Sequence, residues 1–267
     1  MHAFGGVFPN RPSLRDILSQ QKDLYEGEFY RANRWRWVFR DDCRYRKNRL
    51  LEVLGQLGFS CDDARIFELG FGTGDLLFHF PTACTLMGVE LSEAAVQAIS
   101  ADPRLDRYSG EWFRALAEDG SVPTPPRRAD LVLASHVLEH VPDDRRTVSQ
   151  LIEVARKGGL VAIFVPIEPP DYDPKHVRRY TVDSLSDLMA GEGLKIVHAE
   201  SNYHIRSGPM RWLDHPARHD WPVLKSLEGI RDLALTLLPY AATRGVEELL
   251  HHAGVEGSQA MVIGKRV

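Results

Sequence analysis

The chain has 267 residues, 43% of them hydrophobic, and its 33 Lys and Arg against 37 Asp and Glu give a formal net charge of −4. This length and hydrophobic content are enough to form one large domain or two small ones. The charge balance argues against a general nucleic-acid-binding protein. Three widely spaced cysteines argue against a disulfide framework or a zinc cluster. With no leader at the start and no apolar run of roughly 18 residues, we expect a soluble, cytoplasmic protein.

The first sixty residues combine an aperiodic arm, residues 1–12, with a helical pattern that begins at Ser13. Residues 31–49 carry eight basic side chains among aromatic ones and admit two interpretations. Arginines interleaved with aromatic rings can bind phosphates and stack on bases, as on a nucleic-acid-binding surface. We favour the alternative, an amphipathic helix with its arginines on a solvated face. The apolar residues near helical spacing are Phe39, Cys43, Leu50, Leu54 and Leu57.

Residues 66–74 form the most informative stretch, Ile-Phe-Glu-Leu-Gly-Phe-Gly-Thr-Gly. A short apolar run ends in an acid, three alternating glycines follow, and residues 75–80 can open a helix. Glycines suit a tight turn with positive φ angles and let a ligand lie against the backbone. The pattern predicts a strand, turn and helix that hold a nucleotide-like ligand, although an ordinary glycine-rich turn has the same composition.

A second apolar strand, residues 85–91, ends at Glu90, whose carboxylate can accept both hydroxyls of a ribose. The spacing E-x-G-x-G-x-G differs from the G-x-G-x-x-G of NAD-binding folds, because Asp75 stands where the third glycine would be. It resembles the first motif of class I S-adenosylmethionine-dependent methyltransferases, nearest to the ubiquinone/menaquinone-biosynthesis type. The resemblance implies S-adenosylmethionine as cofactor and S-adenosylhomocysteine as product. It assigns cofactor contacts to Glu68, Gly70, Gly72, Gly74, Glu90 and Leu91.

The third strand is expected within residues 105–113, after a helix that Ser92 caps and that extends through Ser100. In the family an acid and an apolar neighbour that follow this strand contact the adenine. Glu111 and Trp112 are the matches here, although the usual Gly-Asp-Ala pattern is missing.

Residues 129–134 read as the fourth strand, and the following S-x-V-L-E-H-V resembles a second signature of the same branch. Ligands of open α/β sheets bind at the carboxyl ends of the strands, so Ser135 and His136 are placed to contact the methionine end of the cofactor or the acceptor. Glu139 and His140 admit two roles. They can hold the loop to neighbouring backbone as a buried pair, or they can take part in catalysis.

Residues 144–157 predict a helix closed by Gly158 and Gly159, and residues 160–166 predict a strand buried on both faces. The H-x-R-x-Y-T spacing that follows resembles an element of this branch, in front of a helix over 182–190 capped by Thr181. It is either a structural clamp or an anion-binding helix start. We expect His176 and Tyr180 in the pocket. The candidate catalytic residues are thus His176, His136, His140 and Tyr180.

Strands are further expected at 194–199 and 260–265, separated by an insert over 201–258 that is too long for a hairpin and that contains two helix-like segments, 224–238 and 246–252. The resemblance implies an α/β, Rossmann-like seven-stranded sheet of order 3-2-1-4-5-7-6, with the last strand antiparallel. It divides the chain into an arm and helical lid, 1–60, and a methyltransferase domain, 61–267. Asp214, His215, His219 and Asp220 could in principle bind a metal, but no second motif supports this and we expect none.

Three functions fit these patterns. The first is methyl transfer to an oxygen, nitrogen or carbon of a small molecule, anionic or aromatic, in secondary or cofactor metabolism, by a monomer or homodimer. The second is an RNA or DNA methyltransferase that uses residues 31–49, although the Asn-Pro-Pro-Tyr type motif of amino-methylating DNA enzymes is absent. The third is a non-catalytic protein that retains the fold.

Overall fold

The computed structural model describes residues 41–117, 119–169, 176–207 and 222–267. The expected N-terminal arm, most of the lid and the Asp214–Asp220 cluster lie outside these residues.

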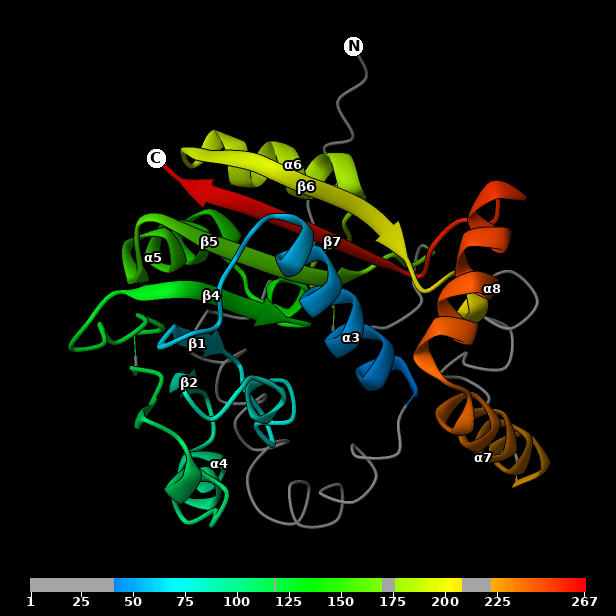
Figure 1. The fold of residues 1–267 in the computed structure, drawn as a ribbon. Coiled ribbons are helices and arrows are strands. Elements are labelled where there is room, and N and C mark those ends of the chain that lie inside the picture. Colours follow the sequence, from blue (N-terminus) through cyan, green and yellow to red (C-terminus); the bar gives the residue numbers. More distant parts are fainter. Residues whose placement is uncertain (1–40, 118, 170–175, 208–221) are drawn as a thin grey trace, which may run out of the picture.

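A seven-stranded sheet forms the centre of the molecule (Figure 1). Its order is β3-β2-β1-β4-β5-β7-β6, with β7 antiparallel to β5 and to β6, which confirms the predicted topology. The strands are β1 (Arg65–Leu69), β2 (Thr85–Glu90), β3 (Gly110–Ala115), β4 (Ala129–Ser135), β5 (Ala155–Pro166), β6 (Leu194–Asn202) and β7 (Gln259–Arg266). The carboxyl ends of β1, β2 and β4 meet at one edge, because these strands run parallel.

Helices cover both faces of the sheet. α5 (Asp144–Val154) and α6 (Val182–Gly191) pack on one face, and α3 (Asp41–Gln56) and α4 (Glu93–Ser100) pack on the other. Along β4, Val132 belongs to the first apolar cluster, while Leu131 and Leu133 belong to the second. Strands covered on both sides need apolar residues at successive positions, which accounts for the nearly continuous apolar runs.

Two helix boundaries differ from those expected. α5 ends at Val154, and β5 begins at Ala155, so Gly158 and Gly159 lie inside a strand and do not close the helix. Gly158 has a φ of 73°, and the β4–β5 pairing shifts register in this region. The segment 75–80 forms only a short 3₁₀ helix, Leu77–His79. By contrast, α6 begins as predicted, with Thr181 and Ser184 forming a reciprocal capping box.

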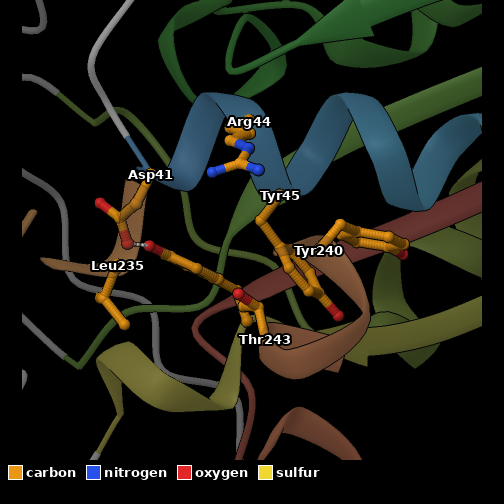
Figure 2. Close-up of a pocket in the computed structure, with 7 residues that line it drawn as sticks. Asp41, Arg44, Tyr45, Leu235, Tyr240 and Thr243 are labelled. Carbon is orange, nitrogen blue, oxygen red and sulfur yellow. Dashed lines mark hydrogen bonds between the residues drawn. The ribbon is translucent and has the colours of Figure 1, made fainter. Parts of the chain in front are cut away.

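The insert between β6 and β7 contains α7 (Pro222–Leu237) and α8 (Tyr240–His252), which confirms the two predicted helices. Both helices contact α3, beyond the end of β6 (Figure 1). A small pocket lies among the three helices and the segment after β6 (Figure 2). Burial raises the pKa of its Asp41 to about 6, against the opposing effect of Arg206. The lining residues are Asp41, Arg44, Tyr45, Tyr203, Leu235, Tyr240 and Thr243.

The arginines of α3 do not lie on a solvated face, so that prediction is wrong for the described half of the 31–49 stretch. Cys43, Leu50 and Leu54 are buried as predicted, whereas Leu57 lies beyond the helix and is 36% exposed. Arg49 is also buried. Its guanidinium donates to both carboxylate oxygens of Glu200 in β6, which compensates the buried charge. The charged side chains of α3 therefore attach this helix to the sheet.

All three cysteines are free thiols, with Cys43 and Cys84 buried, as expected for reduced side chains that fill space. In the described ranges, no helix combines the length and apolar character needed to cross a membrane.

Candidate functional site

The glycine turn after β1 has the predicted backbone geometry. Gly70, Gly72 and Gly74 have φ angles of 72°, 53° and 72°, which side chains with a Cβ rarely adopt. A Cβ on Gly70 would stand 2.4 Å from Cγ2 of Val137. The turn thus brings bare backbone to the carboxyl end of β1, close to the loop after β4.

Glu90 ends the neighbouring strand β2 and directs its carboxylate toward this turn. Oε2 accepts from the Gly72 amide at 2.8 Å and Oε1 from the Leu91 amide at 2.7 Å. Burial raises the pKa of Glu90, while backbone hydrogen bonds from Gly72, Leu91 and Ser92 oppose this. A carboxylate offers about four acceptor positions, so these backbone bonds leave at least one position for a hydroxyl of a ribose.

Glu68 provides a test of whether a cationic ligand fits here. Its side chain is 3% exposed, and in the described part of the chain its Oε2 has no hydrogen-bond partner. Burial raises its pKa well above the ordinary value, against an opposing effect of Arg46. A buried oxygen without a partner is costly, and a ligand that brings a donor, such as an ammonium group, would satisfy it. The site therefore fits S-adenosylmethionine, which carries a ribose and an ammonium group.

The third strand corrects one assignment. Because β3 spans Gly110–Ala115, Glu111 and Trp112 lie near its amino end, paired with Leu86 and Met87 of β2, and not after the strand. The position after β3 belongs to Leu116, whose amide donates to the Glu90 carbonyl at 2.8 Å. The polar composition of this strand obscured its end in the sequence.

Arg46 and Gln259 join the site although sequence reasoning missed both. Arg46, on α3, donates to Oγ of Ser135 at 3.0 Å and to Oε1 of Gln259 at 2.9 Å. Gln259 begins the terminal strand β7, 213 positions away from Arg46. No local pattern signals a contact over this distance, so only the fold reveals it. Ser135, a predicted site residue, is thus bound to the helix that crosses the sheet.

A chain of hydrogen bonds fixes the orientation of His136, which has a φ of 55°. The Glu200 carboxylate can only accept, so Nδ2 of Asn202 must donate to it, at 2.9 Å. The side-chain oxygen of Asn202 then faces Gln259 and accepts from its Nε2, also at 2.9 Å. The Gln259 oxygen therefore faces Nε2 of His136 at 3.1 Å, and this nitrogen must donate. Because Nε2 of His136 donates to Gln259, this nitrogen cannot serve as a general base.

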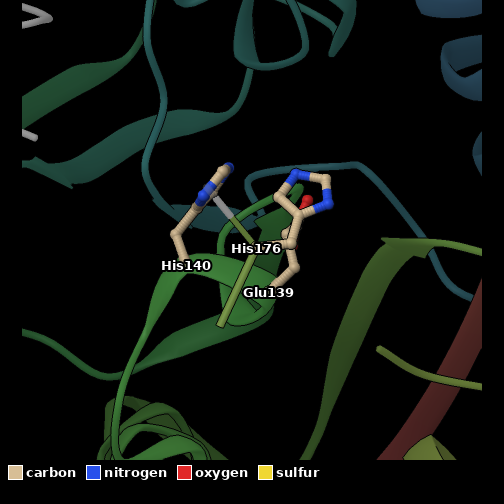
Figure 3. Close-up of side chains that lie close together, drawn as sticks. All are labelled: Glu139, His140 and His176. Carbon is tan, nitrogen blue, oxygen red and sulfur yellow. The ribbon is translucent and has the colours of Figure 1, made fainter. Parts of the chain in front are cut away.

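Three further predicted residues meet where β4 and β5 end (Figure 3). Glu139 and His140 lie on a 3₁₀ turn after β4, and the rings of His140 and His176 have centroids 4.8 Å apart. Glu168, which follows β5, accepts at 2.6 Å from Nδ1 of His176. The Val177 amide donates to the Glu139 carbonyl at 2.8 Å and ties the two segments together. Two histidines are thus held together beside a carboxylate that is 1% exposed.

Tyr180 has a different environment from the other catalytic candidates. It is 6% exposed, and its hydroxyl donates to the Asp144 carboxylate at 2.9 Å at the start of α5. Burial, followed by the charge of Asp144, raises its pKa strongly. This geometry favours a structural contact between the loop and α5 over a catalytic role for Tyr180.

A family model described as a methyltransferase domain matches residues 67–161, which run from β1 to β5. A putative sarcosine dimethylglycine methyltransferase from Galdieria sulphuraria superposes with a TM-score of 0.55 at 13% identity, covering 82% of this chain and 84% of that one. That likeness establishes the fold.

Curated relatives agree with the family model. A probable S-adenosylmethionine-dependent methyltransferase of Mycolicibacterium smegmatis is 28% identical over 57% of this chain, which spans 60% of that relative's length. The 27-O-demethylrifamycin SV methyltransferase of Amycolatopsis mediterranei is 27% identical over 68% of this chain and 69% of its own length.

Proposed function

Because this chain belongs to the class I S-adenosylmethionine-dependent methyltransferases, we propose that it transfers a methyl group from S-adenosylmethionine to a small-molecule acceptor. The observation that carries the proposal is the junction of β1 and β2. There a turn of three positive-φ glycines lies against the buried Glu90 carboxylate. The same residues lie within the matched segment 67–161.

The residues of the junction divide the recognition of the cofactor between them. Glu90 would accept the ribose hydroxyls, and the unpartnered Oε2 of Glu68 would accept the ammonium group. Gly70 and Gly72 would let the ligand lie against the backbone, and Leu116, beside Glu90, would pack against the adenine. Bound S-adenosylmethionine supplies a methyl group already activated for direct attack, so the chain mainly orients the acceptor and excludes water.

The acceptor would enter above the ends of β4 and β5, between the glycine turn and α3. His140 and His176 are the candidates for proton removal from a hydroxyl or ammonium acceptor when no metal ion is bound to them. His136 would position the loop, because its Nε2 is committed to Gln259. The rifamycin-type relative supports a small-molecule acceptor and a place in secondary metabolism.

The nucleic-acid alternative receives no support from the described half of the 31–49 stretch. Arg49 pairs with Glu200, and Arg46 contacts Ser135 and Gln259 inside the protein. Guanidinium groups engaged in this way are not available for a row of phosphates.

Calorimetric titration with S-adenosylhomocysteine tests the cofactor site. Glu90→Ala should weaken binding by about 1–3 kcal/mol, or roughly 5- to 150-fold, because it leaves ribose hydroxyls unpaired. Glu111→Ala is the matched control, since this exposed carboxylate lies at the other end of β3. Melting temperatures of both variants exclude unfolding as the cause. Equal affinity of Glu90→Ala and the unsubstituted protein would remove the ribose assignment.

Transfer of label from methyl-labelled S-adenosylmethionine into host extract tests the acceptor class. Label in the small-molecule fraction supports the proposal and identifies the product. Label confined to RNA or DNA would overturn it in favour of a nucleic-acid methyltransferase. Cofactor binding without any transfer to an extract that contains the natural metabolites would indicate a binding protein.

A further inference from the structure

We propose that Glu139, His140 and His176 form a binding site for a divalent transition-metal ion, with Zn²⁺ as the best match. Each residue offers one ligand atom, and these atoms lie within 4.8 Å of one another. Glu139 and His140 lie just after β4, whereas His176 comes from the loop after β5 (Figure 3). The fold, and not local sequence spacing, assembles this ligand set.

The carboxylate of Glu139 gives an independent indication of a cation. Its side chain is 1% exposed. Oε1 forms an ion pair with Nδ1 of His136 at 3.3 Å when that imidazole is protonated, whereas Oε2 has no hydrogen-bond partner among the described residues. A buried carboxylate oxygen without a partner is costly. A bound cation beside His140 and His176 would satisfy it.

Outer contacts hold the ligand side chains in orientations that suit a metal. Glu168 accepts from Nδ1 of His176 at 2.6 Å, so a metal would bind on the Nε2 side of the ring. A carboxylate bonded to the second nitrogen is the usual support of a metal-binding histidine. The backbone bond from Val177 to Glu139 holds the two loops in register.

The donor set selects among metals. Two imidazoles and one carboxylate, with a further position for water or an acceptor atom, are typical of Zn²⁺ and also suit Fe²⁺, Mn²⁺ and Co²⁺, whereas Mg²⁺ and Ca²⁺ prefer all-oxygen sites. Zn–N bonds of about 2.1 Å place neighbouring ligand atoms about 3.4 Å apart in a tetrahedron. With separations of up to 4.8 Å, the ligand atoms need to approach one another by up to about 1.4 Å, which rotamer adjustments can supply.

The test is calorimetric titration of the chelator-treated full chain with ZnCl₂, without S-adenosylmethionine. We expect one site of micromolar affinity or tighter. His176→Asn should weaken it at least 100-fold, and Glu139→Gln at least 10-fold. Glu168→Gln, which acts through His176, should weaken it about 10-fold. His252→Ala is the matched control, because this exposed histidine lies on α8. Its substitution should leave the Zn²⁺ affinity unchanged.

Titration with Co²⁺ gives a readout that does not depend on variant stability. Visible absorption bands of a low-symmetry site that saturate at one equivalent would support the proposal. Absence of one-to-one Zn²⁺ binding by the unsubstituted protein would overturn it, as would binding that His252→Ala removes and His176→Asn leaves intact. Neither result depends on methyl transfer, so failure here leaves the proposed function untouched.

Discussion

The ion pair between Arg49 and Glu200 is expected to stabilise the folded protein measurably, because it attaches α3 to β6. Burial alone would raise the pKa of Glu200, but hydrogen bonds from His198, Arg49 and Asn202 outweigh it and lower the pKa to about 2. Arg49 approaches the two carboxylate oxygens at 2.9 and 2.6 Å. We therefore choose Glu200→Gln, which keeps the shape of the side chain and removes its charge.

The pKa sets the size of the effect and its pH dependence. At about 1.4 kcal/mol per pH unit, lowering the pKa from 4.5 to about 2 stabilises the folded state by about 3 kcal/mol at neutral pH. The sign follows from proton binding, since the unfolded state takes up a proton below pH 4.5 while folded Glu200 stays ionised. The contribution is thus present above pH 4.5, falls to about 2 kcal/mol at pH 3.5 and vanishes below pH 2.

Urea unfolding at pH 7 and pH 3.5 measures this contribution. Glu200→Gln should lower the free energy of unfolding by about 3 kcal/mol at pH 7 and by about 2 kcal/mol at pH 3.5. Glu256→Gln, at an exposed position before β7, is the matched control and should change it by less than about 0.5 kcal/mol. A loss below 1 kcal/mol at pH 7, or one that is equal at both pH values, would refute this account of Glu200, whose charge His198, Arg49 and Asn202 stabilise together.

Two other substitutions test the turn and the tyrosine. Gly70→Ala should lower the free energy of unfolding by at least about 2 kcal/mol more than Gly254→Ala. Both glycines have φ above 70°, but only the first would place its Cβ against Val137, so equal losses in urea unfolding would contradict the clash. Tyr180→Phe should cost about 1 kcal/mol of stability and leave kcat unchanged, because its hydroxyl bonds Asp144. A fall of kcat by 100-fold or more at unchanged stability would instead show that Tyr180 is a catalytic residue.

Features encoded in adjacent residues could be predicted from the sequence. The apolar runs predicted every strand of the sheet except β3, and the alternating glycines predicted the turn with its three positive φ angles. Thr181 and Ser184 marked the start of α6, because a capping box is a local arrangement. These features depend on spacing alone.

Features that depend on packing could not be predicted in this way. The arginines of α3 look solvated in sequence, and their acceptors, Glu200 and Gln259, lie more than 150 positions away. The end of β3 was misplaced because Glu111 and Arg114 interrupt its apolar residues. Gly158 and Gly159 resemble a helix end but lie inside β5. The sequence predicted either a structural or a catalytic role for Glu139 and His140 but not their proximity to His176, which joins them only in three dimensions.

The position of α3 couples the two sides of the site. This helix lies between the sheet and the insert helices α7 and α8. Its Arg46 donates to Ser135 on the acceptor side, and its Lys47 pairs at 2.8 Å with Asp75, directly after the glycine turn on the cofactor side. Substitutions in the insert that shift α3 should therefore change the acceptor side and the cofactor side together.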